Sequence, residues 1–182
     1  MTDQTAASTL ENLQAAFNGE SNARARYLAF AKKADEEGYA QAARLFRAAS
    51  RAEEIHAANH AAVIRRMDAT ASAAIQPVNV QSTRENLREA IKGEVYERDV
   101  MYPNFLAQAR AENNAAAVRT FSLALAVEAE HAALYTLALE NLESWRKAAG
   151  PYYVCPVCGS TLEALRDCAI CRAPKERFET IL

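Results

Sequence analysis

Six ionisable residues stand in apolar runs, at positions where a helix would face the protein interior. A buried glutamate is rare unless something compensates its charge, and a metal ion is an effective compensation. Residues three apart lie on one face of a helix, so a Glu-x-x-His pair presents a carboxylate and an imidazole together. These side chains are therefore candidate metal ligands. The six residues are Glu20, Glu53, His56, Glu94, Glu128 and His131.

The candidate ligands belong to two halves of an internal repeat. Glu94 follows Glu20 by 74 positions, and the second Glu-x-x-His pair follows the first by 75. One glutamate from each of two helices, with Glu-x-x-His from each of the other two, is the ligand pattern of ferritin-like bundles that hold two iron or two manganese ions. The repeat therefore predicts a di-metal site, which we expect to be di-iron, inside a four-helix bundle.

Two further features of the repeat bear on this site. Glu97 lies three residues after Glu94 and faces the same side, whereas the matching position of the first half holds Ala23. The repeat thus predicts one extra carboxylate that has no symmetry mate. Gly19 and Gly93 directly precede the two single glutamates. Glycine destabilises a helix by about 1 kcal/mol relative to alanine. Close approach of the helices at these two positions would explain why glycine is nevertheless present, and we expect it there.

Three neighbouring ionisable residues are not assigned as ligands. His60 has no partner in the repeat, so we predict that it lies behind the ligands or at the surface. Glu54 and Glu130 adjoin the ligands but point away from the apolar face. They are interpreted as solvated charges.

Four long helices are expected to position the ligands. Two Ser-x-x-Glu capping boxes, at Ser8 and Ser82, mark the starts of the first and third helices. The polar segment 69–81 is long enough to cross the bundle. Pro103 should kink the third helix one turn beyond its glutamates. The first helix is predicted to end near 37, the second to span 40–67 and the fourth to span 115–146.

All four cysteines lie close together near the end of the chain, in two C-x-x-C pairs. The residues after Gly150-Pro151 are too few to bury a core unaided, so a metal is expected to staple them. Four thiolates in two turns make a tetrahedral site for zinc or a single iron, and spacing alone does not choose between them. We predict a bundle domain over 1–150 and a four-cysteine domain over 151–182. The ligands are Cys155, Cys158, Cys168 and Cys171.

Charge and hydropathy exclude several other classes of protein. The net charge of −2 gives no broad attraction to nucleic acid or to an anionic membrane. No uninterrupted apolar run approaches the roughly 18 residues of a membrane helix. The first ten residues lack the basic flank and apolar stretch of a secretory signal. We therefore expect a soluble cytoplasmic protein that binds neither nucleic acid nor membrane.

Several short motifs of the chain occur together in one known family. They are Gly19-Glu20-Ser21-x-Ala23-Arg24, the two Glu-x-x-His pairs, Glu94-x-x-Glu97 followed by Met101-Tyr102-Pro103, Tyr153-x-Cys155-Pro-x-Cys158-Gly159, and Ala173-Pro174-Lys175 with Phe178. On these motifs the whole chain, from the first helix onward, resembles rubrerythrins. In rubrerythrins a ferritin-like di-iron domain is followed by a rubredoxin-like domain that holds one iron ion.

The second cysteine pair departs from the family pattern, because it lacks the usual proline and glycine and the loop before it is short. Arg172 follows the second cysteine pair where a glycine is usual. If the backbone is left-handed there, arginine would be strained by roughly 1 to 2 kcal/mol. The resemblance implies iron in the four-cysteine site, and this departure leaves zinc as the alternative.

The resemblance implies a role for each site residue. Glu53 and Glu128 would bridge the two irons. Glu20 would bind the first iron, and Glu94 with His131 the second. The first iron would move between Glu97 when oxidised and His56 when reduced. Tyr27 and Tyr102 match family residues that hydrogen-bond the metal-binding carboxylates.

The resemblance also implies an activity and partners. Rubrerythrins reduce hydrogen peroxide to water as part of oxidative-stress defence. The cysteine-bound iron would relay single electrons inward from a rubredoxin-type or flavin reductase. A homodimer is implied because family dimers bring this iron near the partner's di-iron site.

Two other function classes stay open from the sequence. The first is a ferroxidase or iron-handling protein, which would react chiefly with oxygen. The second is a binding protein without enzymatic activity, whose zinc ribbon would contact a partner. Glu97 and the attached four-cysteine site favour the peroxidase, whereas Arg172 mildly favours zinc.

Overall fold

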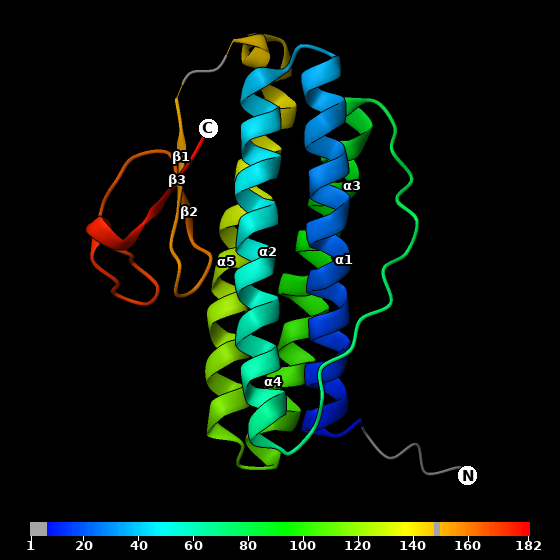
Figure 1. Cartoon of the computed structure of the whole chain (residues 1–182), viewed down its shortest axis with the longest axis vertical. Coiled ribbons are helices and arrows are strands. Elements are labelled where there is room, and N and C mark those ends of the chain that lie inside the picture. Colours follow the sequence, from blue (N-terminus) through cyan, green and yellow to red (C-terminus); the bar gives the residue numbers. More distant parts are fainter. Residues whose placement is uncertain (1–6, 148–149) are drawn as a thin grey trace.

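Four helical segments form a bundle in the computed structural model, which describes residues 7–147 and 150–182 (Figure 1). Helix α1 packs mainly against α2, and α5 packs against α3 and α4. The predicted four-helix bundle is confirmed. The segments are α1 (Thr9–Glu36), α2 (Ala40–Arg66), a composite of α3 (Thr83–Tyr96), the π-helix η1 (Glu97–Met101) and α4 (Tyr102–Ala111), and α5 (Ala115–Glu140).

The capping boxes predicted at two helix starts are present. The Ser8 and Ser82 side chains accept from the backbone N–H groups of Glu11 and Glu85, and the two glutamates accept from the serine backbones in return. Each box satisfies N–H groups that a helix start otherwise leaves unpaired. The sequence therefore located both starts to within a residue.

The segment between α2 and α3 crosses the length of the bundle, as predicted, and runs along the outside of α1 (Figure 1). Two asparagines of α1 hold it there. The Asn18 carboxamide oxygen accepts from Ala74 N at 2.9 Å, and the Asn22 oxygen accepts from Gln76 N at 2.8 Å. These bonds satisfy backbone groups of a segment that has no secondary structure of its own.

The third helical segment contains an extra residue beside the candidate site. Between the two halves, Glu20 and Glu94 are 74 positions apart, but Tyr27 and Tyr102 are 75 apart. The π-helix η1 lies between Glu94 and Tyr102 and accommodates the added residue. A π turn that was not predicted from the sequence thus begins at Glu97. Pro103 lies in the first turn of α4, where its missing N–H costs least.

The fourth helix is shorter than predicted. Helix α5 ends at Glu140, and a 3-10 helix, η2 (Leu142–Arg146), follows it. The Arg146 guanidinium donates to the Glu37 carbonyl at 3.1 Å and to the Tyr39 hydroxyl at 2.9 Å. The end of this segment therefore contacts the α1–α2 connection.

A small antiparallel sheet follows the bundle, in the order β2-β1-β3. It lies beside α2 and α5, away from the crossover (Figure 1). Tyr152 and Val154 of β1 are buried in the same apolar cluster as residues of α2. The predicted boundary near 150 adjoins residues 148–149, which with residues 1–6 lie outside the described residues. The elements are β1 (Tyr152–Val154), β2 (Thr161–Leu162), the 3-10 helix η3 (Lys175–Arg177) and β3 (Glu179–Ile181).

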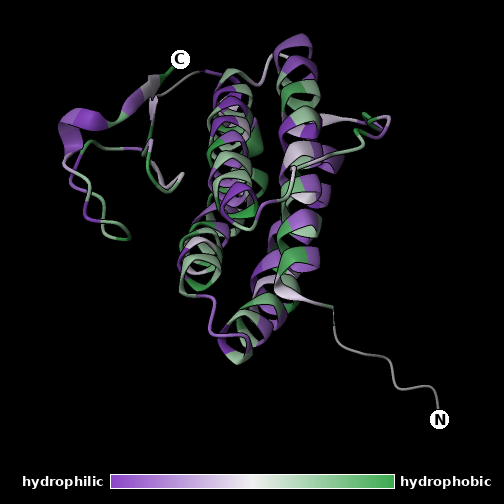
Figure 2. Cartoon of the chain, turned by 60° about the horizontal axis from the view of Figure 1, so that its bottom comes forward, coloured by the Kyte–Doolittle hydropathy of each residue, from purple (hydrophilic) through white to green (hydrophobic). Residues whose placement is uncertain are grey.

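Two apolar clusters fill the bundle, one towards each end. One contains Phe30, Phe46 and Tyr135, and the other contains Leu13 and Phe121. Hydrophilic and hydrophobic residues alternate around each long helix in Figure 2, as amphipathic helices require. Along every helix the candidate ligands fall between the two clusters. Among the described helices, none combines the length and the hydrophobicity needed to cross a membrane.

Candidate metal centres

The structure brings the six repeat residues together at the centre of the bundle. Their ligand atoms form two groups in which all atoms lie within 4.8 Å of one another. Glu53 and Glu128 belong to both groups, as expected of carboxylates that bridge two metal ions. All six residues are buried. The first group adds Glu20 and His56 to the shared pair, and the second adds Glu94 and His131.

Both histidines direct Nδ1 into the carboxylate cluster. His56 Nδ1 lies 3.0 Å from a Glu53 oxygen and 3.0 Å from a Glu128 oxygen. His131 Nδ1 lies 3.2 Å from the other Glu128 oxygen and 3.6 Å from the other Glu53 oxygen. Each of the two shared carboxylates therefore turns one oxygen towards each half of the site.

The donor set fits two bound metal ions. Glu20, Glu53, Glu94 and Glu128 each have one buried oxygen that accepts no hydrogen bond. A buried carboxylate oxygen without a partner is costly unless a cation satisfies it. Four such oxygens and two imidazole nitrogens converge on one volume, which suits iron or manganese.

Without metal, the cluster holds protons in place of cations. Burial alone would lower the pKa of His56, but Glu128 and Glu53 raise it to about 10. Burial raises the pKa of Glu94 to about 8, with further contributions from Glu53 and Glu128. The pKa of Glu53 is lowered, because the neighbouring His131 and His56 outweigh the opposing effect of burial. At pH 7 the metal-free site therefore carries imidazolium and carboxylic acid protons that a metal must displace.

Metal uptake at pH 7 is accordingly expected to release more than one proton. His56, with a pKa of about 10, and Glu94, with a pKa of about 8, are protonated below those values, so affinity should rise as pH rises from 6 to 8. Calorimetric titration with zinc in buffers of different ionisation enthalpy measures the release, once the cysteine site has been filled. Binding that releases no protons and does not depend on pH would contradict this expectation.

Two buried tyrosines donate hydrogen bonds to Glu20 and Glu94, and each tyrosine comes from the opposite half of the repeat to its glutamate. The Tyr27 hydroxyl donates to Glu94 Oε1 at 2.5 Å, and the Tyr102 hydroxyl donates to Glu20 Oε1. Burial raises the pKa of both hydroxyls well above the usual value, with Glu94 or Glu20 adding to the shift, so both remain donors. Each tyrosine thus fixes one carboxylate oxygen and leaves the other free for a metal.

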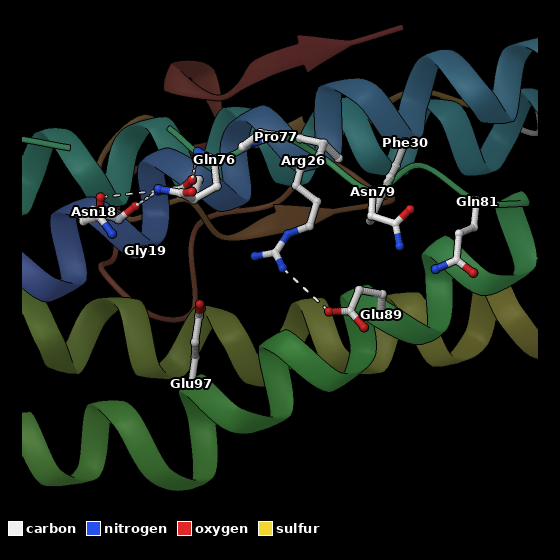
Figure 3. Close-up of a pocket in the computed structure, with 12 residues that line it drawn as sticks. Asn18, Gly19, Arg26, Phe30, Gln76, Pro77, Asn79, Gln81, Glu89 and Glu97 are labelled. Atoms are coloured by element: carbon white, nitrogen blue, oxygen red, sulfur yellow. Dashed lines mark hydrogen bonds and ion pairs between the residues drawn. The ribbon is translucent and has the colours of Figure 1, made fainter. Parts of the chain in front are cut away.

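Glu97 lies at the edge of the cluster and belongs to neither ligand group. It is half-buried and lines a cavity of about 440 Å³ between α1, the crossover and α3. In Figure 3 its side chain points into this cavity, below Gly19 and Arg26. Burial raises its pKa well above the usual value, and Glu128 and Glu94 add to the shift. Glu97 is therefore close enough to sense the ligands electrostatically.

The close helix approach expected at Gly19 and Gly93 is wrong for both glycines. A Cβ atom at Gly19 would meet nothing within 4 Å, and one at Gly93 would only touch the Tyr27 hydroxyl at 4.0 Å. Gly19 instead lines the cavity that contains Glu97. The missing side chain thus leaves open space beside Glu20.

The residues not assigned as ligands fall outside both groups. Glu54 is partly exposed and pairs with Arg24 at 3.2 Å and Arg51 at 2.8 Å. Glu130 is half-buried and lines a separate pocket. His60 is fully buried behind Glu20, which agrees with the first of the two positions predicted for it.

The four cysteines form a second candidate centre. Their sulfur atoms all lie within 4.8 Å of one another, with Cys155 and Cys171 3.4 Å apart and Cys158 and Cys168 3.5 Å apart. Such spacing suits a tetrahedral ion bound by four thiolates. A hydrogen bond to Cys158 is the main reason why the pKa of Cys155 falls to about 5, so one thiolate is present before any metal binds.

The two cysteine turns have the same backbone but different surroundings. Gly159 N donates to Cys155 O at 2.9 Å, and Arg172 N donates to Cys168 O at 3.0 Å. Gly159 has φ of 85° and Arg172 has φ of 63°, so the left-handed backbone foreseen for Arg172 is present. Arg172 is exposed, and its side chain therefore has room. The Gly159 turn instead faces the bundle.

The cysteine module contacts the carboxylate cluster through its histidines. His56 Nε2 donates to Cys158 O at 3.0 Å, and His131 Nε2 lies 3.2 Å from Thr161 Oγ1. Donation from Nε2 leaves Nδ1 available as the metal ligand. Arg51 strengthens the contact by pairing with both oxygens of Glu179, at 2.7 and 2.9 Å. No sequence pattern indicated these contacts, because a backbone carbonyl and a threonine hydroxyl have no diagnostic spacing.

The fold and the two centres define a ferritin-like di-iron carboxylate protein with a four-cysteine knuckle for one iron or zinc ion. The Rubrerythrin family model matches residues 11–139. The chain belongs to the rubrerythrin family, whose members are di-iron oxidoreductases.

Two relatives show how far the similarity extends. Nigerythrin of Nitratidesulfovibrio vulgaris is 38% identical over 174 residues, which are 94% of this chain and 85% of nigerythrin. Rubrerythrin-2 of Clostridium acetobutylicum is 37% identical and is matched over 95% of this chain and 96% of its own length. The similarity therefore includes the cysteine module as well as the bundle.

Solved structures give the same result for the fold. A structure of fully reduced, all-ferrous nigerythrin matches 98% of this chain and 89% of its own, with a TM-score of 0.90 and 37% identity. A Mycobacterium tuberculosis bacterioferritin matches 75% of this chain and 86% of its own, with a TM-score of 0.68 and 22% identity. The second likeness shows the bundle fold alone.

Proposed function

We propose that this protein is a peroxidase that reduces hydrogen peroxide to water, with a bundle domain over 1–150 and an electron-relay domain over 151–182. The observation that carries the proposal is the position of Glu97. It stands between the ligand groups and an open cavity of about 440 Å³, on a helical turn that contains one extra residue. A spare carboxylate at that place suits a site whose coordination changes during turnover.

Each candidate ligand would have its own role in metal binding. Glu53 and Glu128 would hold both metal positions, Glu20 the first, and Glu94 with His131 the second. His56 belongs to the first group while Glu97 points into the cavity, an arrangement like the reduced form implied by the family resemblance. Ferric iron prefers carboxylate oxygen, whereas ferrous iron accepts imidazole nitrogen more readily. Glu97 and His56 would therefore exchange as ligands of the first position.

Peroxide reduction consumes two electrons and two protons for each molecule (H₂O₂ + 2e⁻ + 2H⁺ → 2H₂O), and two ferrous ions side by side would supply both electrons together. The protein's own part is to admit a small molecule through the cavity and to bury the reacting groups. Tyr27 and Tyr102 would keep the single glutamates oriented while Glu97 moves.

The cysteine module would return electrons to the cluster. Cys158 is a candidate ligand of the module's metal, and its carbonyl oxygen accepts directly from His56 of the cluster. A rubredoxin-type or flavin reductase would supply the electrons from outside. We expect a homodimer from the family resemblance. In this structure the approach of the module to the cluster is made within one chain, so it does not itself require a dimer.

The experiment that tests the function compares two oxidants. The iron-loaded protein is reduced without oxygen and mixed separately with peroxide and with air-saturated buffer, while absorbance follows both iron centres. A peroxidase is oxidised much faster by peroxide. Equal or faster oxidation by oxygen would indicate a ferroxidase instead, and a cysteine site that holds zinc after iron reconstitution would rule out the electron relay.

Replacing Glu97 with alanine is expected to slow peroxide turnover by about 10- to 100-fold, in the range observed when groups that support a metal site are lost. The di-metal site should still form, because Glu97 lies outside both ligand groups. Stopped-flow kinetics and iron analysis measure the two effects.

Glu89→Gln is the matched control for this variant. Glu89 lines the same cavity but pairs with Arg26 at 3.9 Å and is half-exposed. It should turn over peroxide normally. Loss of iron from the Glu97 variant would instead identify Glu97 as a structural ligand.

A further inference from the structure

A third histidine, His60, is the middle member of a buried chain of hydrogen bonds that reaches the metal-binding cluster. His60 Nε2 lies 3.0 Å from the Tyr102 hydroxyl, and His60 Nδ1 lies 3.0 Å from Thr120 Oγ1. The Tyr102 hydroxyl in turn bonds Glu20 Oε1. Three side chains from three helices thus stand in line behind one candidate ligand.

All members of the chain are shielded from water. His60, Tyr102 and Glu20 are each 0% exposed, and Thr120 is 6% exposed. Inside a protein such bonds are stronger than in water, and an unmade bond is costly. This chain of hydrogen bonds therefore has little freedom to rearrange while the protein stays folded.

The direction of every bond in the chain follows from the carboxylate at its inner end. Glu20 can bind a cation only as a carboxylate, so it accepts, and the single hydroxyl proton of Tyr102 is committed to it. The Tyr102 oxygen can then only accept from His60 Nε2–H. A neutral imidazole has one N–H, so Nδ1 must accept from the Thr120 hydroxyl.

The complete burial of His60 agrees with this direction. Burial favours a neutral imidazole, which has the single N–H that the direction requires.

The other half of the repeat lacks such a chain. Tyr27 is the counterpart of Tyr102, and Tyr135 is the counterpart of His60, each 75 positions away. The Tyr135 ring packs on Tyr27 with centroids 5.4 Å apart, but its hydroxyl has no hydrogen-bond partner among the described residues. Among the described residues, a hydrogen-bond chain of this kind therefore lies behind Glu20 and not behind Glu94.

We propose that His60 is a positioning residue of the metal site, which holds the Tyr102 hydroxyl in the orientation that donates to Glu20 and so fixes how Glu20 binds metal. The proposal rests on the metal site and not on the oxidant that the protein reduces. If ligands exchange at the first position, a fixed Glu20 gives that position a constant anchor.

The first test reads the tautomer of His60 directly. The protein has three histidines. In the full-length, zinc-loaded protein, the two histidines other than His60 are expected to bind metal through Nδ1. Two-bond 1H–15N spectra of histidine-labelled protein should show one neutral, metal-free ring protonated at Nε2 between pH 6 and 8. A ring protonated at Nδ1, or at both nitrogens, would overturn the proposal.

The second test separates positioning from packing. His60→Leu removes both hydrogen bonds, whereas His60→Gln can still donate through its amide nitrogen and accept through its oxygen. In the iron-loaded protein, His60→Leu should change the mixed-valence EPR signal of the di-iron site and weaken its iron affinity by about 10- to 100-fold. His60→Gln should restore both towards the unaltered protein.

Two further variants complete the design. Tyr135→Phe is the control from the other half of the repeat and should leave the signal and the affinity unchanged. Thr120→Val keeps the side-chain shape and removes only the outermost bond, so it should give a smaller change of the same kind even if His60→Leu does not fold. A normal signal in Thr120→Val and His60→Leu, or equal losses in the Leu and Gln variants, would disprove the positioning role.

Discussion

Replacing Glu128 with glutamine is expected to prevent stable binding at both metal positions of the carboxylate cluster and to reduce peroxide turnover at least about a hundredfold. Glu128 belongs to both ligand groups, and one of its oxygens lies 3.0 Å from His56 Nδ1 while the other lies 3.2 Å from His131 Nδ1. Loss of groups that merely support ligands already costs about 10- to 100-fold. Loss of a bridging charge should cost more.

Iron analysis and stopped-flow kinetics measure this effect. The variant should keep the iron of the cysteine site, whose ligands lie in another part of the chain. Circular dichroism should show an intact bundle, because both apolar clusters are unchanged. Full loading of the carboxylate cluster in the variant would disprove the bridging role.

Glu54→Gln is the matched control for Glu128→Gln. Glu54 adjoins Glu53, the other shared ligand, in the sequence, but it pairs with Arg24 and Arg51 on a partly exposed face. The same chemical change there should leave iron content and turnover unaltered. Equal losses in both variants would mean that the cluster responds to net charge rather than to ligation.

Replacing Gly159 with alanine should separate the cysteine module from the carboxylate cluster. A Cβ atom at Gly159 would lie 2.7 Å from His56 Nε2 and 3.1 Å from the Ala52 Cβ, so it cannot fit without movement. Helix α2 lies directly behind both contacts. The positive φ of 85° adds a conformational cost of about 1 kcal/mol for alanine. The hydrogen bond from His56 to Cys158 should therefore break.

The expected result is slower electron delivery with both metal sites still loaded. A misplacement of about 1 Å can cost about a hundredfold when it separates reacting groups. Stopped-flow absorbance should show the cysteine-bound iron reoxidised more slowly after peroxide is added. If electrons move at the normal rate, the contact between His56 and Cys158 is not on their route.

Gly150→Ala is the control for Gly159→Ala. A Cβ atom at Gly150 would meet nothing within 4 Å, and its φ lies outside the left-handed region. The same substitution there adds a methyl group close to the start of the module without touching the cluster. Its kinetics should match those of the unaltered protein.

The difference between Gly159 and Arg172 illustrates why a sequence pattern can be relaxed. Both residues close a cysteine turn with a left-handed backbone. Gly159 faces His56, so it must be small as well as flexible. Arg172 faces solvent, so its side chain has room and only its left-handed backbone is unfavourable. The irregular second turn therefore does not prevent the four sulfurs from converging.

The sequence by itself determined the bundle, the crossover and the candidate ligands. Capping boxes at Ser8 and Ser82 and a repeat of buried glutamates are local or periodic features, which a chain must carry in its residue order. Glutamate in an apolar run needs a compensating charge wherever the helix packs, so the need for metal was readable before the fold was known. The four-cysteine site could also be predicted, because the two C-x-x-C pairs are local features of the sequence.

Helix ends and local distortions were less predictable. The π turn at Glu97 was present in the sequence only as a repeat offset that changes from 74 to 75 between Glu94 and Tyr102. Pro103 is a stronger local signal, but it lies in the first turn of α4 and did not indicate the π turn. Beyond the end of α5, Arg146 contacts the α1–α2 connection, and such a contact has no local signature.

The tertiary structure alone decided which side chains support the ligands. Contacts between His56 and the Cys158 carbonyl, and between His60, Tyr102 and Thr120, join residues that are 42 to 102 positions apart. Their residue types are ordinary for a helical core or a turn. Hydrogen bonds depend on distance and direction in space, which only the packing of the helices and the module fixes.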